Sequence, residues 1–303
     1  MILKFISAIV TRVFFIILSL IGIWRVTKVK NDDHFWWLIL LNAPLVVEMI
    51  ILLKIRKGKD FRRFSPAILL FLITIVPSIW ILELHHQQNR NNEPQCMKFH
   101  SWEDVKNMIN SNGSHHNQSG GRVVSSVCPD DWILGLHQAL LILLILGKWV
   151  LPLGGGITRD ELSQLLLIFV GTAADILEFS TETLSDVKEN SPELVYIILA
   201  VWSWSMLQFP HHLAVVRQDE DAGDASDSLL SCCSPDMWVI MESLFIQDGP
   251  FLMVRLLVLI HYQLFHLMLL FFTFKNFLVV ILNLYRLSVI CYDNRKGSKN
   301  DSY

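Results

Sequence analysis

The sequence has little charge and no recognisable catalytic pattern. Asp, Glu, Lys and Arg make up 17 % of its 303 residues and the formal net charge is −3, so the composition gives no indication of nucleic-acid binding. It has no Ser-His-Asp order, no glycine-rich dinucleotide turn and no rhomboid-type Gly-x-Ser-x-Gly pattern. The three glycines at residues 154–156 lack the Lys-Ser/Thr ending of a phosphate-binding loop. We therefore expect a protein that is not an enzyme and carries no cofactor or metal.

Apolar residues, in contrast, are abundant and form long runs. Hydrophobic residues make up 52 % of the chain, and the mean hydropathy is +0.44. A helix needs about 20 apolar residues to cross the hydrocarbon core of a bilayer. The stretches that approach this length are residues 3–24, 35–53, 66–84, 132–151, 162–180 and 193–209, and residues 237–291 have room for two more. The sequence predicts a single all-α membrane domain over residues 1–303, a bundle of about eight transmembrane helices. Its first run is too long for a cleavable signal peptide, so we expect it to remain as the first helix.

The distribution of basic residues predicts the orientation of these helices. The connector at residues 54–65 is strongly basic, and short basic loops stay on the cytoplasmic side. This places the N-terminus in the cytoplasm, and an even number of helices returns the short basic tail at residues 292–303 to the same side. The acidic segment at residues 211–236 follows the sixth predicted helix and is therefore also predicted to be cytosolic. Its acidic character disagrees with this side but does not overturn the assignment, because acidic residues contribute little to orientation. Its adjacent Cys232 and Cys233 are either palmitoylated or free reduced thiols.

The connector at residues 85–131 follows the third predicted helix and should face outward. It contains two N-glycosylation sequons, at Asn112 and Asn117, and two cysteines, Cys96 and Cys128. Sequons are used, and disulfides persist, only on the lumenal or extracellular side. We therefore expect glycans on both asparagines, a disulfide between the two cysteines, and delivery to the plasma membrane through the endoplasmic reticulum.

Charged residues within the apolar runs are the main candidates for function. Such residues cost several kcal/mol in hydrocarbon and usually face partners inside the bundle. Arg12 and Glu48 lie about seven and five residues from the inner ends of the first two predicted helices, so their depths differ by only a few Å. We predict that they pair, and we favour a structural role for the pair over a functional one.

A second group lies on the fifth predicted helix. Gly171, Asp175 and Glu178 are spaced i, i+4 and i+7 and share one face. His137 lies at a matching depth on the preceding antiparallel helix. The three ionisable groups could bind a cation, relay protons or hold a metal, although zinc usually takes about four ligands. In the alternative interpretation, Glu178 is interfacial and His137 hydrogen-bonds to Asp175.

A third group surrounds Pro250 in the seventh predicted helix. Proline removes a backbone donor and clashes with the preceding turn. One interpretation is a helix broken near the midplane, with Asp248 at the break, Glu242 before it and Arg255 after it, because broken helices often create ion or substrate sites. The others are a proline kink whose charges pair within the helix, and an interfacial turn.

Distinctive motifs lie along the whole membrane region. They include Leu-Glu-Leu-His-His at residues 82–86 and Phe-Ile-Gln-Asp-Gly-Pro-Phe-Leu at residues 245–252. Others lie at residues 22–27, 64–68, 134–138, 153–179, 204–210 and 275–280. In these motifs the chain resembles the transmembrane protein 26 family, whereas the external and acidic loops do not match closely. The resemblance implies an eight-helix multi-pass protein at the cell surface; it implies no reaction, ligand or catalytic residue.

Three hypotheses for function follow. The first is a cell-surface protein that sits in the lipid bilayer and acts through protein partners. The second is a transporter, channel or lipid-handling protein that uses the buried charges and a broken seventh helix. The third, which we rank last, is an intramembrane enzyme built on His137, Asp175 and Glu178.

Overall fold

The computed structural model describes residues 2–55, 64–89, 128–150, 159–184, 192–211, 235–263 and 265–300. Within these ranges the chain is helical, apart from short connecting residues and one isolated bridge between Phe64 and His211. The elements in chain order are α1 (Ile2–Lys30), η1 (Asp33–Asn42), α2 (Ala43–Ile55), α3 (Pro66–Asn89), α6 (Pro129–Val150), α7 (Arg159–Glu178), η3 (Phe179–Thr183), α9 (Pro192–Ser205), η4 (Met206–Gln208), α10 (Pro235–Ser243), η6 (Leu244–Asp248), α11 (Gly249–His261) and α12 (Leu267–Asn300). Of these, η1 and η4 are 3₁₀ helices, and η3 and η6 are π-helical segments.

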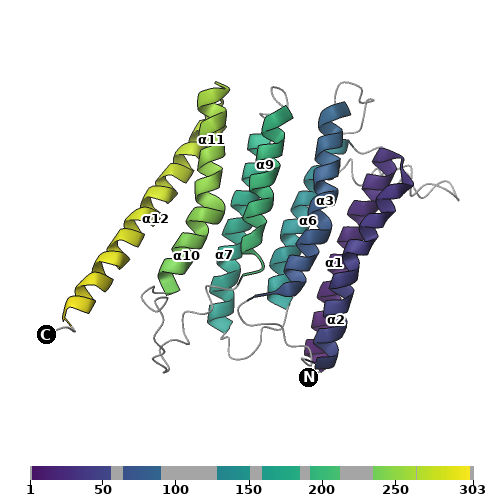
Figure 1. Ribbon diagram of the computed structural model, residues 1–303, viewed down its shortest axis with the longest axis horizontal. Helices are drawn as coiled ribbons and strands as arrows, with labels where there is room; N and C mark the ends of the chain where they lie inside the picture. Colours follow the sequence, from purple (N-terminus) through teal and green to yellow (C-terminus); the bar gives the residue numbers. More distant parts are fainter. Residues whose placement is uncertain are drawn as a thin grey trace, which may run out of the picture.

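The predicted helical membrane protein is confirmed. In the described part of the chain, seven helical spans are long and apolar enough to cross a membrane, and Glu193–Gln208 is a shorter apolar helix. This agrees with the prediction of about eight helices. The Ile2 end of α1 and the last turns of α12 lie at the same end of the bundle (Figure 1). Which side of the membrane that end faces stays a prediction from the basic loops.

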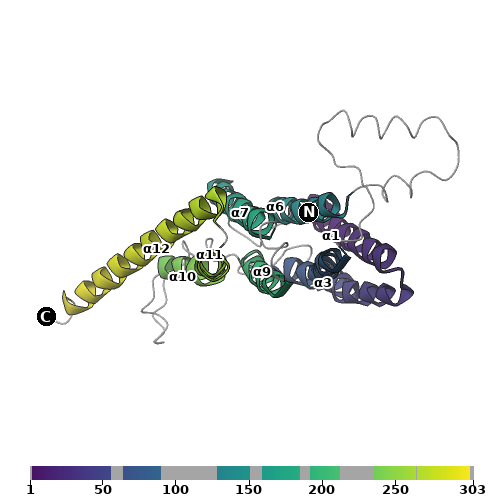
Figure 2. The same cartoon turned by 90° about the horizontal axis from the view of Figure 1, so that it is seen from above.

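The helices form two rows, as the view from above shows (Figure 2). Helices α6 and α7 lie in one row, and α3, α9 and α11 lie in the other. Helix α12 contacts α11 but leans away from the rest of the bundle, so that most of its surface is exposed (Figure 1).

Close packing holds the first helices together. Helices α1, α3 and α6 contact one another, and the rings of Phe15 and Phe71 stack with their centroids 4.4 Å apart. Gly147 of α6 faces this ring, and a Cβ atom there would lie 2.8 Å from Phe15 Cζ. Because lipid chains are as apolar as the core, such close contacts rather than the hydrophobic effect drive helix association in a bilayer.

The seventh predicted helix does not break at Pro250. Backbone dihedral angles remain helical at Asp248 and Gly249, and the chain passes from α10 through the π-helical η6 into α11. The break and the interfacial turn were therefore wrong interpretations. The reason is that the helix widens by one residue instead of opening, which accommodates the proline. A Cβ atom at Gly249 would lie 2.5 Å from the carbonyl oxygen of Leu244, so the wide turn needs glycine there.

Several predicted features lie outside the described residues. These are Cys96, Asn112, Asn117, Cys232 and Cys233, and with them most of the external and acidic loops. The predicted tail at residues 292–303 is helical as far as Asn300, as the end of α12.

Candidate functional site

Arg12 and Glu48 form the predicted ion pair. Arg12 Nε and Nη2 each donate to one carboxylate oxygen of Glu48, both at 2.8 Å. Arg12 also donates from Nη1 to the carbonyl oxygen of Ala8 at 3.2 Å. The Arg12 side chain is 0 % exposed and that of Glu48 is 13 % exposed. This bidentate geometry is the strongest form of such a contact, and it ties α1 to α2.

A second ionic group joins the last helices to α7, and we call it the outer cluster. It consists of Asp175 and Glu178 from α7, Arg255 from α11 and Lys275 from α12. Lys275 Nζ donates to Asp175 at 2.6 Å and to Glu178 at 3.0 Å. Arg255 Nη2 donates to the other oxygen of Glu178 at 2.9 Å, and its Nη1 donates to the carbonyl oxygen of Phe272 at 3.2 Å. Two cations thus neutralise two carboxylates across three helices.

The members of the outer cluster lie inside helical spans that are long and apolar enough to cross a membrane. They are about 7 to 12 Å from the ends of their spans at Thr183, His261 and Leu267. The cluster is buried on one side only: Arg255 is 1 % exposed, whereas Lys275 and Asp175 are 32 % and 38 % exposed.

Polar side chains continue from the outer cluster toward the other end of the bundle. Gln247 donates to Asp175 at 3.5 Å and accepts from Gln208 at 2.8 Å. Asp248 accepts from Ser243 at 2.7 Å and from Asn283 of α12 at 3.1 Å. Asp248 is therefore held in a hydrogen-bonded position between η6 and α12 rather than at an open break.

His137 does not join Asp175 and Glu178 in a cation site. Its ring stacks on Trp202, with centroids 4.8 Å apart and planes 13° apart. Within the described ranges, no three His, Cys, Asp or Glu side chains come together as metal ligands. The physical reason is that Arg255 and Lys275 reach the two carboxylates and occupy the place of the cation that the three groups were expected to bind.

Glu242 belongs to a different place, at the ends of α6 and α9. Its carboxylate lies 3.9 Å from His211 Nδ1. The buried Lys148 donates from Nζ to the carbonyl oxygen of His211 at 3.0 Å and lies over the ring of Phe169. The backbone N–H of Ser65 donates to the carbonyl oxygen of Pro210 at 2.8 Å, so these contacts join α3, α6, α9 and α10.

The participants missed from the sequence are Lys275, Asn283 and Gln208, together with Ser243, Gln247 and Lys148. Lys275 is the one charged residue between residues 267 and 285, so its isolation in an apolar run was a usable signal. It was not used because the boundaries of the last two helices were not fixed. Asn283 and Gln208 carry no charge, and no residue pattern distinguishes these amides from others in the chain.

The charged and polar side chains of the described site contact one another. Opposite charges are in contact, and the amides and hydroxyls around Asp248 act as donors to its carboxylate. No solved structure matches the chain. The family model described as Transmembrane protein 26 matches residues 2–286, which include both ionic groups. The chain therefore belongs to the transmembrane protein 26 family.

Proposed function

We propose that the protein is a cell-surface membrane protein without catalytic activity that acts through protein partners. The observation that carries this proposal is the exposure of the Asp175–Lys275 pair. These two side chains are about one third exposed, although both lie inside membrane-spanning helices.

An ion pair at the lipid-facing edge of a bundle is costly, because hydrocarbon offers neither hydrogen bonds nor charge. Arg255 is shielded by protein, whereas the Asp175–Lys275 edge of the outer cluster is not. A transmembrane helix of a partner would cover that edge. Polar side chains that hydrogen-bond across helices are among the contacts that join helices in membranes.

The surface around the pair has room for such a helix. Helix α12 leans away from the bundle (Figure 1). Phe274 and Leu278, on either side of Lys275 in the sequence, are exposed. A partner helix laid along α12 would contact these apolar side chains together with the exposed ion pair.

The surface location and the external modifications are part of this proposal. They are supported by the sequons at Asn112 and Asn117 and by the burial of Cys128 beside the start of α6. Among the described residues the free cysteine is Cys291, which is consistent with a bond between Cys128 and Cys96.

The second candidate is a transporter, channel or lipid-handling protein. It is favoured by the polar side chains that extend from Asp175 through Gln247 to Asp248 and Asn283, inside the apolar spans. Against it, Asp175 already contacts Lys275, and Asp248 already accepts hydrogen bonds from Ser243 and Asn283.

Site-specific photo-crosslinking in cells tests the first candidate. A photoreactive amino acid at Leu278 should yield a protein adduct of defined mass, whereas the same group at the exposed Phe14 of α1 should yield none. The adduct should disappear in the double variant Asp175→Leu/Lys275→Met, which removes the exposed pair and leaves Glu178 with Arg255.

The double variant Arg12→Met/Glu48→Leu is the matched control. It also removes an ion pair, but one inside the bundle, so the adduct at Leu278 should persist. An adduct that survives loss of the outer pair contradicts the proposal. Lipid or ion flux in proteoliposomes of the wild type, abolished by Asp248→Asn, would support the second candidate instead.

A further inference from the structure

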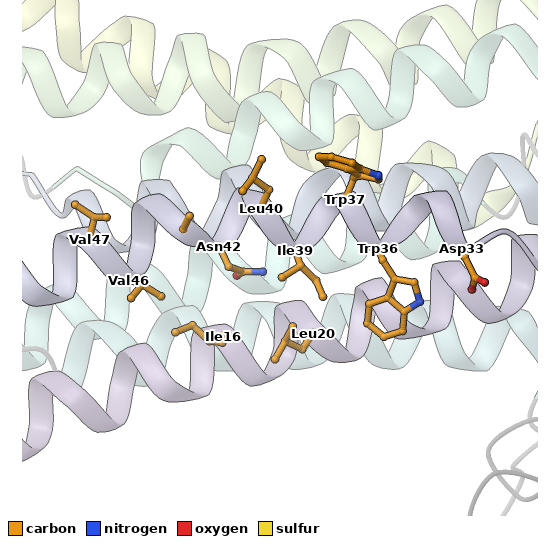
Figure 3. Close-up of a pocket in the computed structure, with 11 residues that line it drawn as sticks. Ile16, Leu20, Asp33, Trp36, Trp37, Ile39, Leu40, Asn42, Val46 and Val47 are labelled. Carbon is orange, nitrogen blue, oxygen red and sulfur yellow. The ribbon is translucent and has the colours of Figure 1, made fainter.

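A groove runs between α1 and the second transmembrane span. Its volume is about 830 Å³, and apolar side chains form most of its wall, with Ile16 and Leu20 on α1 and Ile39 and Val46 opposite them (Figure 3). The groove is open along one side. Because both walls belong to membrane-spanning segments, the open side faces hydrocarbon.

The conformation of η1 gives this groove its pattern. η1 holds ten residues in a 3₁₀ helix, although runs of more than three or four are uncommon. With three residues per turn, side chains at i and i+3 eclipse one another. Asp33, Trp36, Ile39 and Asn42 therefore form one straight row, and all four line the groove. At about 2 Å per residue, the row places Asp33 and Asn42 roughly 18 Å apart.

The inner end of the row is a polar group without a partner. Asn42 is 5 % exposed, and neither the oxygen nor the nitrogen of its amide has a hydrogen-bond partner among the residues that the structure describes. Figure 3 shows its side chain between η1 and α1, in line with Ile39 and Trp36. An unpaired amide in an apolar environment is expensive, so its presence at the end of a groove indicates a ligand that pairs with it.

The outer end of the row is acidic and aromatic. Asp33 and Trp36 lie there, at the start of the span. The preceding Asp32 caps η1 by accepting from His34 N at 3.0 Å and from its ring Nδ1 at 2.8 Å. The backbone hydrogen bond from His34, and then the ring contact, lower the pKa of Asp32, the residue next to Asp33, below its ordinary value. The carboxylate of Asp33 at this mouth suits a hydroxyl or amine donor.

We propose that this groove binds an elongated lipid with a polar group at each end, of the kind represented by a side-chain-hydroxylated sterol. One hydroxyl donates to Asp33 at the outer mouth. The apolar body lies against Trp36, Ile39 and Leu20, and the far hydroxyl bonds to the amide of Asn42. A lipid with one polar end would fill the same space and leave Asn42 unpaired.

Binding is coupled to the backbone. In an α-helix each residue turns by about 100°, so Asp33 and Asn42, nine residues apart, would point to opposite sides. The two polar ends line one groove only in the 3₁₀ form. A ligand that contacts both ends therefore stabilises η1 in this conformation, by the difference in its affinity for the two forms.

The test is binding of labelled 25-hydroxycholesterol to the purified full chain in lipid nanodiscs, with unlabelled cholesterol as competitor. We expect saturable binding of the dihydroxylated sterol and about five- to tenfold weaker binding of cholesterol, the effect of one hydrogen bond. Asn42→Leu should weaken binding of 25-hydroxycholesterol by the same factor and leave cholesterol unchanged. Asn276→Leu removes another buried asparagine, on α12, and should change neither.

A second variant keeps the polar ends and fills the space between them. Ile39→Trp should abolish binding of both sterols while Asn42 remains, with thermal unfolding of each variant compared to verify folding. Equal affinity for cholesterol and 25-hydroxycholesterol, an unaltered affinity in Asn42→Leu, or the absence of saturable binding would each overturn the proposal.

Discussion

Removing one partner of the Arg12–Glu48 pair should destabilise the protein far more than removing both. The pair has two hydrogen bonds of 2.8 Å, and Arg12 is fully buried. Truncating one member of a buried pair costs about 3 to 5 kcal/mol because the other charge stays in an apolar environment, whereas replacing both by apolar residues is often neutral. Arg12→Met and Glu48→Leu should each lose about that amount, and the double variant should recover most of it.

The structure also predicts an asymmetry between the two single variants. A lone carboxylate can take up a proton and become neutral, whereas a guanidinium keeps its charge. Glu48 is also slightly exposed, whereas Arg12 is not. Glu48→Leu, which strands the arginine, should therefore be the more destabilising change.

The measurement is a double-mutant cycle on unfolding in lipid nanodiscs, with delivery to the cell surface as a second readout. The expected coupling between the two sites is about 3 kcal/mol or more, well above the 0.3 to 0.5 kcal/mol scatter of independent sites. Additive effects of the two substitutions would refute the reasoning, since they would show that the contact contributes nothing of its own.

Three further predictions concern the other sites. Lys275→Met should block surface delivery, and a second change, Asp175→Leu, should restore it, because Glu178 keeps Arg255; failure of this rescue would contradict the pairing. Gly249→Ala should lower the thermal unfolding temperature, because its Cβ atom would overlap a backbone oxygen at 2.5 Å; an unchanged temperature would mean that the wide turn tolerates a side chain. The cap at Asp32 should weaken as the pH falls through its lowered pKa, since a carboxyl with a depressed pKa stabilises above its ordinary value of 3.8 and loses that contribution below. The protection of the His34 amide, its exchange rate relative to that of an unfolded peptide at the same pH, would then fall, and constant protection would argue against the cap.

The depth of a charged residue in the membrane could be predicted from the sequence where the ends of its helix were clear. Arg12 and Glu48 were paired correctly from the sequence because the inner ends of both helices were clear: the first apolar run begins at residue 3, and the basic connector follows the second. Asp175 and Glu178 were recognised as one face of one helix, but their partners were assigned to His137. Lys275 was overlooked because its helix could not be positioned along the chain.

The π-helical turn in η6 and the 3₁₀ conformation of η1 could not be predicted from residue patterns. The Gly249-Pro250 pair is typical of both a break and a π-helical turn, and which one forms depends on packing against α12. Likewise, the 3₁₀ conformation of η1 leaves no signature in an apolar run, since its row from Asp33 to Asn42 becomes visible only when the period of three is known.

The position of the cations has a consequence for synthesis. Glu48 is synthesised only 36 residues after Arg12, so the first two helices can enter the membrane as a hairpin in which this pair is neutral. Glu178 precedes Arg255 by 77 residues and Lys275 by 97, so α7 emerges from the ribosome long before its counter-charges. Until Arg255 and Lys275 are synthesised, the carboxylates of Asp175 and Glu178 must either be shielded by the insertion machinery or a chaperone, or be protonated. The last helix thus completes the assembly, and chains halted before Lys275 should remain at the site of insertion.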